Sequence, residues 1–332
     1  MPPLRNAALL AAALALATPA LAQAPAAPPA TVSTATETVN VMNKLWGRHA
    51  GLRANHARGV VVTGSFAPTP EAAGLSMAGI FSGKPVPVTV RFSDATGLPD
   101  LADGADAANP HGMSIRFQPE GGSYVDVVLN SLPYFPVATG EEFLQLLQAA
   151  SESGPDAPKP TKIEQFIATH PAAATAGANV RTPTSFARQT YNGIDAFIFV
   201  DAQGKRQPFR FQFQPVAGVE LMEKEAAAKM PPDFLLAELP ERLKKGKAEF
   251  RVMAQLANPG DQTKDPSQPW PADRRMVNLG TITLTGAVAD EAKAQHDLRF
   301  LPNHLQPGIE VSDDPLIDAR VRSYVISFGR RG

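Results

Sequence analysis

The sequence predicts an α+β protein: an antiparallel eight-stranded β-barrel with peripheral helices and a C-terminal helix. Three observations support this fold class. Between Gly59 and Thr285 the chain carries short runs rich in Val, Ile, Phe and Thr, which are typical of strands. The breaks between these runs are short and draw on 25 Gly and 32 Pro, which favours a meander over strand–helix–strand crossovers. Helical spacing appears near both ends and in one central region.

The first predicted element of the domain is a helix over Thr36–Gly47, in which apolar residues recur at helical spacing and a glycine provides the stop. Asp201–Gly204 reads as the turn of a hairpin with aromatic and polar residues alternating on either side. The predicted strands are 60–63, 86–92, 113–117, 124–129, 194–200, 209–213, 248–256 and 276–285. Further helices are predicted over 140–153, 162–169 and 316–328.

The N-terminus has the three parts of a secretory signal peptide: a basic residue at Arg5, a short apolar run, and a small-x-small cleavage site ending at Ala22. We expect residues 1–22 to be removed, 23–35 to form a Pro/Ala-rich linker, and 36–332 to form one domain. The alternative for the first segment is a buried Ala-rich helix. No later segment approaches about 20 consecutive apolar residues, so we expect a periplasmic protein without a membrane span.

Composition excludes several classes of chemistry. The 332 residues are 44% hydrophobic, enough for a sizeable core, and 31 Lys+Arg against 32 Asp+Glu give no support for a nucleic-acid or acidic-lipid partner. The absence of Cys excludes disulfides, Cys-ligated zinc, iron–sulfur clusters, thiol nucleophiles and covalent c-type haem attachment. No His-Glu-x-x-His pair, phosphate-binding Gly loop or Gly-x-Ser-x-Gly elbow is present, although counting residues leaves a Ser-His-Asp hydrolase open.

Five segments together resemble, in the same order, those that build the haem site of catalases. They are Leu52–Gly59, Val90–Ser93, Asn109–Phe117, Asp126–Pro133 and parts of Phe300–Tyr324. The closer match is to the short, secreted catalase-related peroxidases, because the chain ends eight residues after Tyr324 and is expected to lack the C-terminal helical region of large catalases. The resemblance implies a catalase-like haem-dependent barrel that binds haem b, the ferric protohaem.

The resemblance implies that Tyr324 is the axial ligand of the haem iron. A phenol ligates iron well when it is ionised, and Arg320 lies four residues earlier, on the same helical face. Its guanidinium would favour the phenolate through charge and hydrogen bonding. Taken alone, the two residues would read as an ordinary surface pair.

On the other haem face, the resemblance implies that His56 moves a proton between the two peroxide oxygens. Asn130 would orient the peroxide through its amide, and Ser93 would contact the His56 ring and fix its tautomer. Each has an ordinary alternative when taken alone: a strand-edge histidine, a turn asparagine and a strand serine.

The two haem propionates require basic partners, and Arg53 and Arg91 match family arginines with that role. A third partner would be Arg331, with Arg330 as the alternative. The apolar walls of the haem pocket are expected to include Phe92, Phe135 and Phe328. Asn55 and His111 depart from the large catalases, which usually carry an apolar residue and an arginine at these positions.

The function implied is reduction of hydrogen peroxide or organic hydroperoxides with a small organic electron donor, together with weak catalase activity, in antioxidant defence. The alternative is a periplasmic carrier of haem or another apolar ligand, which would have no need for His56 and Asn130. We expect a monomer or a homodimer.

Overall fold

The structure is a computed structural model that describes residues 30–178 and 180–332. The expected signal peptide, residues 1–22, lies outside the described residues, as does the expected linker up to residue 29. Helix α1 (Ala30–Trp46) begins earlier than the sequence predicted, so residues 30–35, which we assigned to the linker, belong to this helix.

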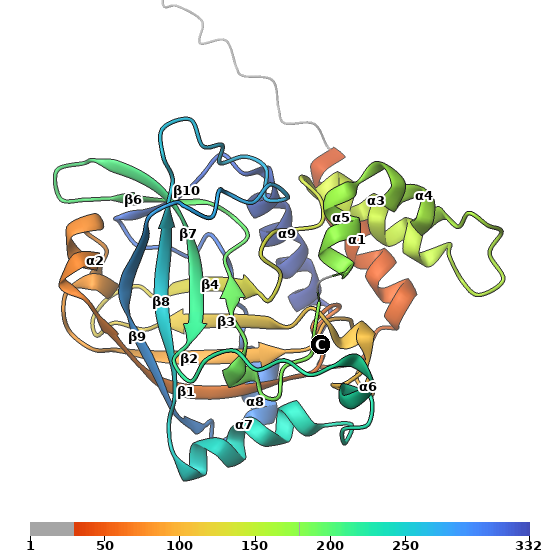
Figure 1. Cartoon of the computed structure of the whole chain (residues 1–332), viewed down its shortest axis with the longest axis horizontal. Helices are drawn as coiled ribbons and strands as arrows, with labels where there is room; N and C mark the ends of the chain where they lie inside the picture. The colour runs from red at the N-terminus through yellow and green to blue at the C-terminus, as the bar shows by residue number, and fades with distance from the viewer. Residues whose placement is uncertain (1–29, 179) are drawn as a thin grey trace, which may run out of the picture.

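A closed antiparallel β-barrel forms the body of the molecule (Figure 1), as predicted. Each strand pairs with the next, and the last pairs with the first. Its eight strands are β1 (Gly59–Pro68), β2 (Val86–Ser93), β3 (Gly112–Phe117), β4 (Val125–Asn130), β5 (Tyr191–Asn192), β7 (Arg206–Pro215), β8 (Ala248–Leu256) and β9 (Met276–Ala287). Two further strands, β6 (Phe197–Val200) and β10 (Ile309–Val311), extend the sheet from the first half of β7. The predicted hairpin is therefore β6–β7.

Alternation along the strands places apolar side chains inside the barrel. In β8, for example, every second residue from Ala248 to Leu256 is buried. The interior is rich in phenylalanine, and Phe92, Phe213 and Phe250 are fully buried there. At Gly64 the pairing of β1 with β9 shifts by one residue, and a Cβ atom there would lie 2.1 Å from the Thr283 carbonyl oxygen, so glycine is required.

Three helices pack together beside the barrel: α1, α3 (Gly140–Ser151) and α9 (Pro315–Gly329). Their side chains contribute to a second, smaller hydrophobic cluster centred on Val39, Met42 and Leu147. The close approach of α3 to α9 depends on Gly140, where a Cβ atom would lie 2.6 Å from the Cβ of Ala319. The cluster and the barrel core thus meet at the face where Figure 1 places α9.

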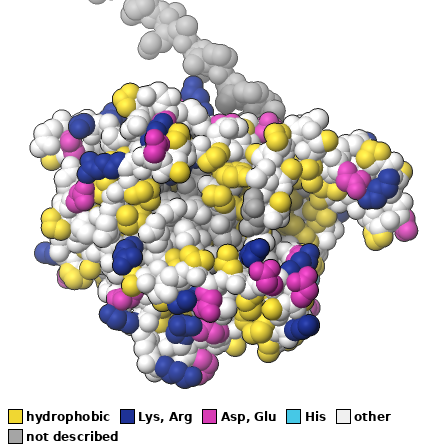
Figure 2. Space-filling view, in the orientation of Figure 1, with side chains coloured by type: hydrophobic (Ala, Val, Ile, Leu, Met, Phe, Trp, Pro, Cys, Tyr) yellow, Lys and Arg dark blue, Asp and Glu magenta, His cyan; other side chains and the backbone are white. Residues whose placement is uncertain are grey.

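The remaining helices surround the barrel and the α3 end. They are α2 (Pro70–Leu75), α4 (Lys162–Thr169), α5 (Pro171–Ala178), α6 (Lys224–Ala227), α7 (Phe234–Lys245) and α8 (Glu291–Asp297). Within the described ranges, none of the helices is long and apolar enough to cross a bilayer. On the face seen in Figure 2, basic and acidic side chains are interspersed.

Candidate active site

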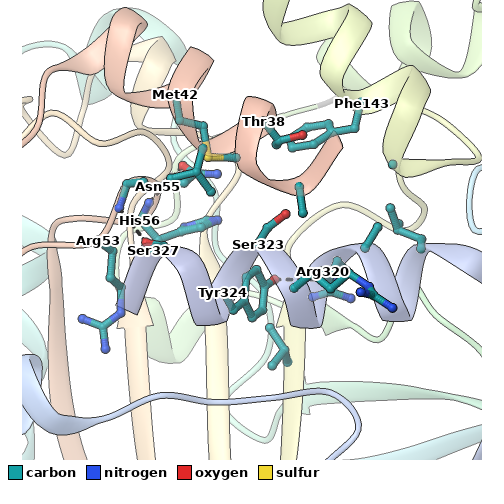
Figure 3. Close-up of a pocket in the computed structure, with 18 of the residues that line it drawn as sticks. Thr38, Met42, Arg53, Asn55, His56, Phe143, Arg320, Ser323, Tyr324 and Ser327 are labelled. Carbon is teal, nitrogen blue, oxygen red and sulfur yellow. Dashed lines mark hydrogen bonds between the residues drawn. The ribbon is translucent and has the colours of Figure 1, made fainter. Parts of the chain in front are cut away.

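A cavity of about 430 Å³ lies where the barrel meets α1, α3 and α9, a volume in the range of small-molecule and cofactor sites. All eight site residues predicted from the sequence line it. They are Arg53, His56, Arg91, Ser93, Asn130, Arg320, Tyr324 and Arg331. Figure 3 shows α9 along one side of this cavity, with Met42 and Phe143 on the opposite side.

Helix α9 supplies the phenol and its basic partner. Asp314 caps the helix by accepting a hydrogen bond from Leu316 N at 2.8 Å, and a proline occupies the first turn. One turn apart on this helix, Arg320 Nε donates to the Tyr324 Oη at 3.1 Å (Figure 3). Arg320 also forms a buried ion pair with Asp195. Burial alone lowers the pKa of Arg320, but Asp195 and Tyr324 outweigh it and raise that pKa, so the guanidinium stays charged.

His56 lies on the barrel side of the cavity with one ring nitrogen engaged. Its Nδ1 is 2.7 Å from the main-chain oxygen of Asp94 and 3.2 Å from Ser93 Oγ. Because a carbonyl oxygen only accepts, Nδ1 carries the hydrogen and Nε2 of the neutral ring is the acceptor. Burial, followed by the charge of Arg91, lowers the pKa of His56 to about 4. The ring is therefore neutral at pH 7, and its Nε2 can accept a proton.

Three neighbouring strands place Ser93, Gly112 and Asn130 opposite one another in register. The Asn130 Oδ1 accepts a hydrogen bond from Leu132 N at 2.8 Å, which leaves the amide nitrogen as the group available to the cavity. A Cβ atom at Gly112 would lie 2.8 Å from Ser93 Oγ and 3.3 Å from a ring carbon of His56. The absence of a side chain at this position therefore gives the histidine its room.

Three arginines gather at one edge of the cavity; Arg91 and Arg331 are buried and Arg53 is half-buried. Arg53 donates to the side chain and main chain of Gln295, and Arg91 Nε donates to the Gln295 side chain at 2.6 Å. Arg331 donates to main-chain carbonyls, but its Nε is buried without a hydrogen-bond partner. Burial and then the repulsion between these charges lower the pKa of Arg91 to about 9 and that of Arg53 well below its usual value. Glu291 offsets part of the repulsion, and the remaining positive charge suits an anionic group.

The structure also shows which of the alternative arginines and which of the expected phenylalanines line the cavity. Arg331 lines the cavity, whereas Arg330 donates to the side chains of Asn40 and Asn43 in α1. Phe135 lines the cavity as expected. The expectation for two other phenylalanines was wrong: Phe92 lies in the barrel core, and Phe328 lies outside the cavity lining, beneath Arg331.

This donor set fits haem. It places a phenol paired with a charged guanidinium on α9, a neutral imidazole on the barrel side, and a cluster of buried guanidiniums with an unmet hydrogen-bond donor at one edge. If haem binds here, the phenol would ligate its iron, the imidazole would serve as a base, and the guanidiniums would pair with its carboxylates.

Comparison with known proteins agrees with the resemblance to catalases found in the sequence. The family model of catalase matches residues 37–330. The chain belongs to the catalase family. It is 32% identical to a catalase-related peroxidase of Synechococcus elongatus, over 91% of this chain and 90% of the relative, and 33% identical to one of Mycolicibacterium paratuberculosis, over 88% and 92%. Catalase-2 of Bacillus subtilis is 29% identical, but the match spans only 42% of that longer protein.

Solved structures of catalases share the fold of this catalase-family chain. Catalase A from Saccharomyces cerevisiae superposes with a TM-score of 0.76 at 21% identity, covering 85% of this chain and 62% of the yeast chain. A fungal catalase gives a TM-score of 0.75 at 22% identity, covering 85% and 59%. The match includes the barrel expected from the sequence, with α9 as its C-terminal helix.

Several contacts of the site were not predicted. The main-chain oxygen of Asp94 is closer to the His56 ring than Ser93 Oγ is. The sequence could not predict this contact, because any residue type supplies a main-chain oxygen. Gln295 bridges two arginines from a helix with no buried residues, which hydrophobic periodicity does not detect. Asp195 directly precedes the apolar stretch 196–200 of the predicted strand, and a carboxyl buried there is itself a signal for a basic partner.

Proposed function

We propose that this chain is a haem b peroxidase that reduces hydrogen peroxide or organic hydroperoxides with small organic electron donors, with weak catalase activity. The observation that carries the proposal is the neutral His56, whose Nδ1 donates to the Asp94 carbonyl and whose Nε2 is free in the cavity that Tyr324 also lines. The names of the two relatives that match over most of their length support the peroxidase assignment. A role in antioxidant defence follows from that reaction.

The residues divide the work as follows. Haem, if bound, would supply the redox chemistry, by which two electrons from the organic donor reduce the peroxide. Tyr324 would supply the axial oxygen, and Arg320 stabilises negative charge on it. Arg53, Arg91 and Arg331 would hold the propionates.

On the opposite side of the cavity, His56 Nε2 accepts the proton from the inner peroxide oxygen and returns it to the outer one. The Asn130 amide donates a hydrogen bond to the peroxide as negative charge develops on it. The mature chain thereby separates two tasks, cofactor retention by α9 and the arginines, and proton movement by two side chains on the barrel.

The alternative function is a periplasmic carrier of haem or an apolar ligand. A carrier would use Tyr324 and the arginine cluster, but it would gain nothing from a neutral histidine whose tautomer is fixed. The carrier is therefore the less favoured reading, and one experiment separates the two.

The test is the visible absorption spectrum of the haem-loaded mature protein, before and after one equivalent of hydrogen peroxide. We expect stoichiometric haem with a tyrosinate-type spectrum that peroxide changes and a phenolic donor restores. His56→Ala should slow the reaction with peroxide by about 10²–10⁴-fold while haem stays bound, because it removes the proton acceptor. His296→Ala, at an exposed position, is the control. Bound haem that peroxide leaves unchanged in the unmodified protein would favour the carrier.

A further inference from the structure

A buried polar cluster lies directly behind His56, outside the cavity. Asp94 and His111 have no solvent exposure. Both carboxyl oxygens of Asp94 and the Nε2 of His111 lack a conventional hydrogen-bond partner among the described residues. His111 Nε2 and Asp94 Oδ1 are 3.5 Å apart, and Arg58 Nε is 3.5 Å from Asp94 Oδ2. Buried polar atoms left in this state are costly and require an explanation.

Arg58 does not neutralise Asp94 well, because two other carboxylates bind it more closely. Its Nη2 is 2.7 Å from Asp103 Oδ1 and 2.6 Å from Asp233 Oδ1. Asp103 Oδ2 also accepts a hydrogen bond from Leu235 N at 2.7 Å, at the start of α7. One guanidinium thus faces three carboxyl groups, and Asp94 has the poorest geometry of the three. A proton is therefore expected to reside at Asp94.

His111 can receive that proton in a hydrogen bond. Gln189 Nε2 donates to the Arg181 carbonyl, which turns its Oε1 toward His111 Nδ1 at 3.1 Å. Nδ1 must then donate, so the neutral ring has its lone pair on Nε2, the atom that faces Asp94. Burial lowers the pKa of His111 to about 4, while burial and then Asp103 raise the pKa of Asp94 to about 8. At pH 7 both groups are neutral, with Asp94 as the donor.

The cluster acts on His56 through the backbone. The Asp94 main-chain oxygen accepts the hydrogen bond from His56 Nδ1 at 2.7 Å. His56 has a φ of +57°, a left-handed conformation that is strained for a non-glycine residue and persists only where its surroundings enforce it. The Asp94 carbonyl can provide such enforcement if the Asp94 side chain is itself held in place by His111.

We propose that Asp94 and His111 are positioning residues that hold one proton between them and so fix the Asp94 carbonyl as the acceptor that sets the tautomer and tilt of His56. This role deepens the proposed function and rests on His56 being the base. Its first readout, however, does not depend on turnover.

The groups that face the Asp94 carboxyl come from several elements. Arg58 precedes β1, Asp103 lies between β2 and β3, and His111 precedes β3. Tyr191 of β5 is also close enough for the Asp94 charge to affect it, and its pKa is raised well above the usual value, by burial first and then by Asp94. On the other side lies Arg91 of β2, whose pKa the ionised form of Asp94 would raise.

Infrared spectroscopy of the haem-loaded mature protein tests the shared proton. We expect a carboxylic-acid C=O band that disappears in Asp94→Asn and that fades in the unmodified protein as the pH rises through about 8. Asp126→Asn is the matched control, because Asp126 is equally buried but paired through both oxygens with Arg116, and its replacement should leave the band intact. Identical spectra of the unmodified protein and Asp94→Asn in the carboxylic-acid region would overturn the proposal.

The second readout is the rate at which peroxide changes the haem spectrum. Asparagine can still donate to His111 Nε2, so Asp94→Asn should stay within about threefold of the unmodified protein, whereas Asp94→Leu should lose about tenfold or more with haem still bound. If Asp94→Leu does not fold, His111→Leu replaces it, with the same loss expected. Equal losses in Asp94→Asn and Asp94→Leu would overturn the positioning role. A normal rate in His56→Ala would instead refute the proposed function, while the infrared result would stand.

Discussion

His56 illustrates how a single residue is shaped by its neighbours. Its backbone adopts a left-handed conformation, and a side chain at Gly112 would crowd its ring at 3.3 Å. Its ring hydrogen is directed to a main-chain oxygen, and its charge state is set by burial and by Arg91. The orientation, tautomer and charge state of His56 therefore depend on residues from several segments of the chain.

The pH dependence of the reaction follows from the lowered pKa of His56. The ring accepts a proton only when neutral, so the rate of reaction with peroxide should be constant between pH 5 and 7 and should fall as the pH drops through about 4. Stopped-flow spectroscopy of the haem-loaded protein measures this rate, with circular dichroism at each pH to confirm that the protein is folded. An inflection near 6.5, the value of an unperturbed histidine, would contradict the assigned environment.

Gly112→Ala tests the space beside the His56 ring. The added Cβ would meet Ser93 Oγ and the imidazole at distances below normal contact, so the ring must tilt. A shift of the ring by a few tenths of an ångström should lower the rate of reaction with peroxide, by less than the roughly 10²-fold that a misplacement of about 1 Å costs. Gly286→Ala, at a strand glycine with open space around it, is the control and should react normally. Equal rates in both variants would show that the ring has freedom the structure does not indicate.

At the scale of elements, α9 connects both sides of the site. Arg320, Tyr324 and Ser327 lie on the cavity side of this helix (Figure 3). The Ser327 hydroxyl accepts a hydrogen bond from Ala54 N at 3.1 Å, two residues before His56. A shift of α9 would therefore move the phenol and the segment that carries the base together.

The packing of α3 against α9 gives a prediction at this scale. Gly140→Ala would place a methyl group 2.6 Å from the Ala319 side chain and force the two helices apart. We expect a loss of about 1–3 kcal/mol in the free energy of unfolding, measured by denaturant titration. Gly154→Ala, just beyond α3 in open space, should change it by less than about 0.5 kcal/mol. A neutral Gly140→Ala would mean that the helices do not need this close approach.

The elements that the sequence predicted are those with a strong local pattern. Helix α9 was found because Pro315 marks its start and apolar residues continue to Phe328. Helix α7 was missed because Pro240 stands inside it and interrupts the helical pattern. Strand β5 has two residues, too few for any alternation, and exists because the barrel closes around it.

At the scale of the whole molecule, the site draws on distant parts of the chain. Arg53 precedes the first strand, Arg91 lies within β2, and Arg331 follows the last helix. Local patterns carry no information about such proximity, so only the ordered resemblance to catalases predicted that these residues meet. The folded chain adds what resemblance left open, namely that Arg331, and not Arg330, lines the cavity.

The arginine cluster predicts how haem affects the whole protein. Without an anion the three guanidiniums repel one another, so haem removal should lower the thermal unfolding midpoint, most strongly at low salt, where screening is weakest.

Arg331→Gln should weaken haem affinity about tenfold or more, because a charge-assisted contact is lost. Arg330→Gln, its neighbour outside the cavity, should bind haem normally. The reverse order of affinities would assign the propionate contact to Arg330.

Export remains a proposal, supported by the pattern of the first 22 residues. If residues 1–22 are removed, the protein recovered from the periplasmic fraction should begin at Gln23, as determined by intact mass. Light scattering on the same sample should give the mass of a monomer or a homodimer. An intact leader on protein found in the cytoplasm would contradict the proposed location.

The two hydrophobic clusters meet at the cavity and are otherwise separate. Opening the smaller one, around Val39 and Met42, exposes far less apolar surface than opening the barrel, so α1 and α3 can detach at a fraction of the cost of global unfolding. Backbone amides of these helices should therefore exchange with deuterium well before those of the barrel strands. Haem would then bind against a barrel that is already folded, and the helices would close over it.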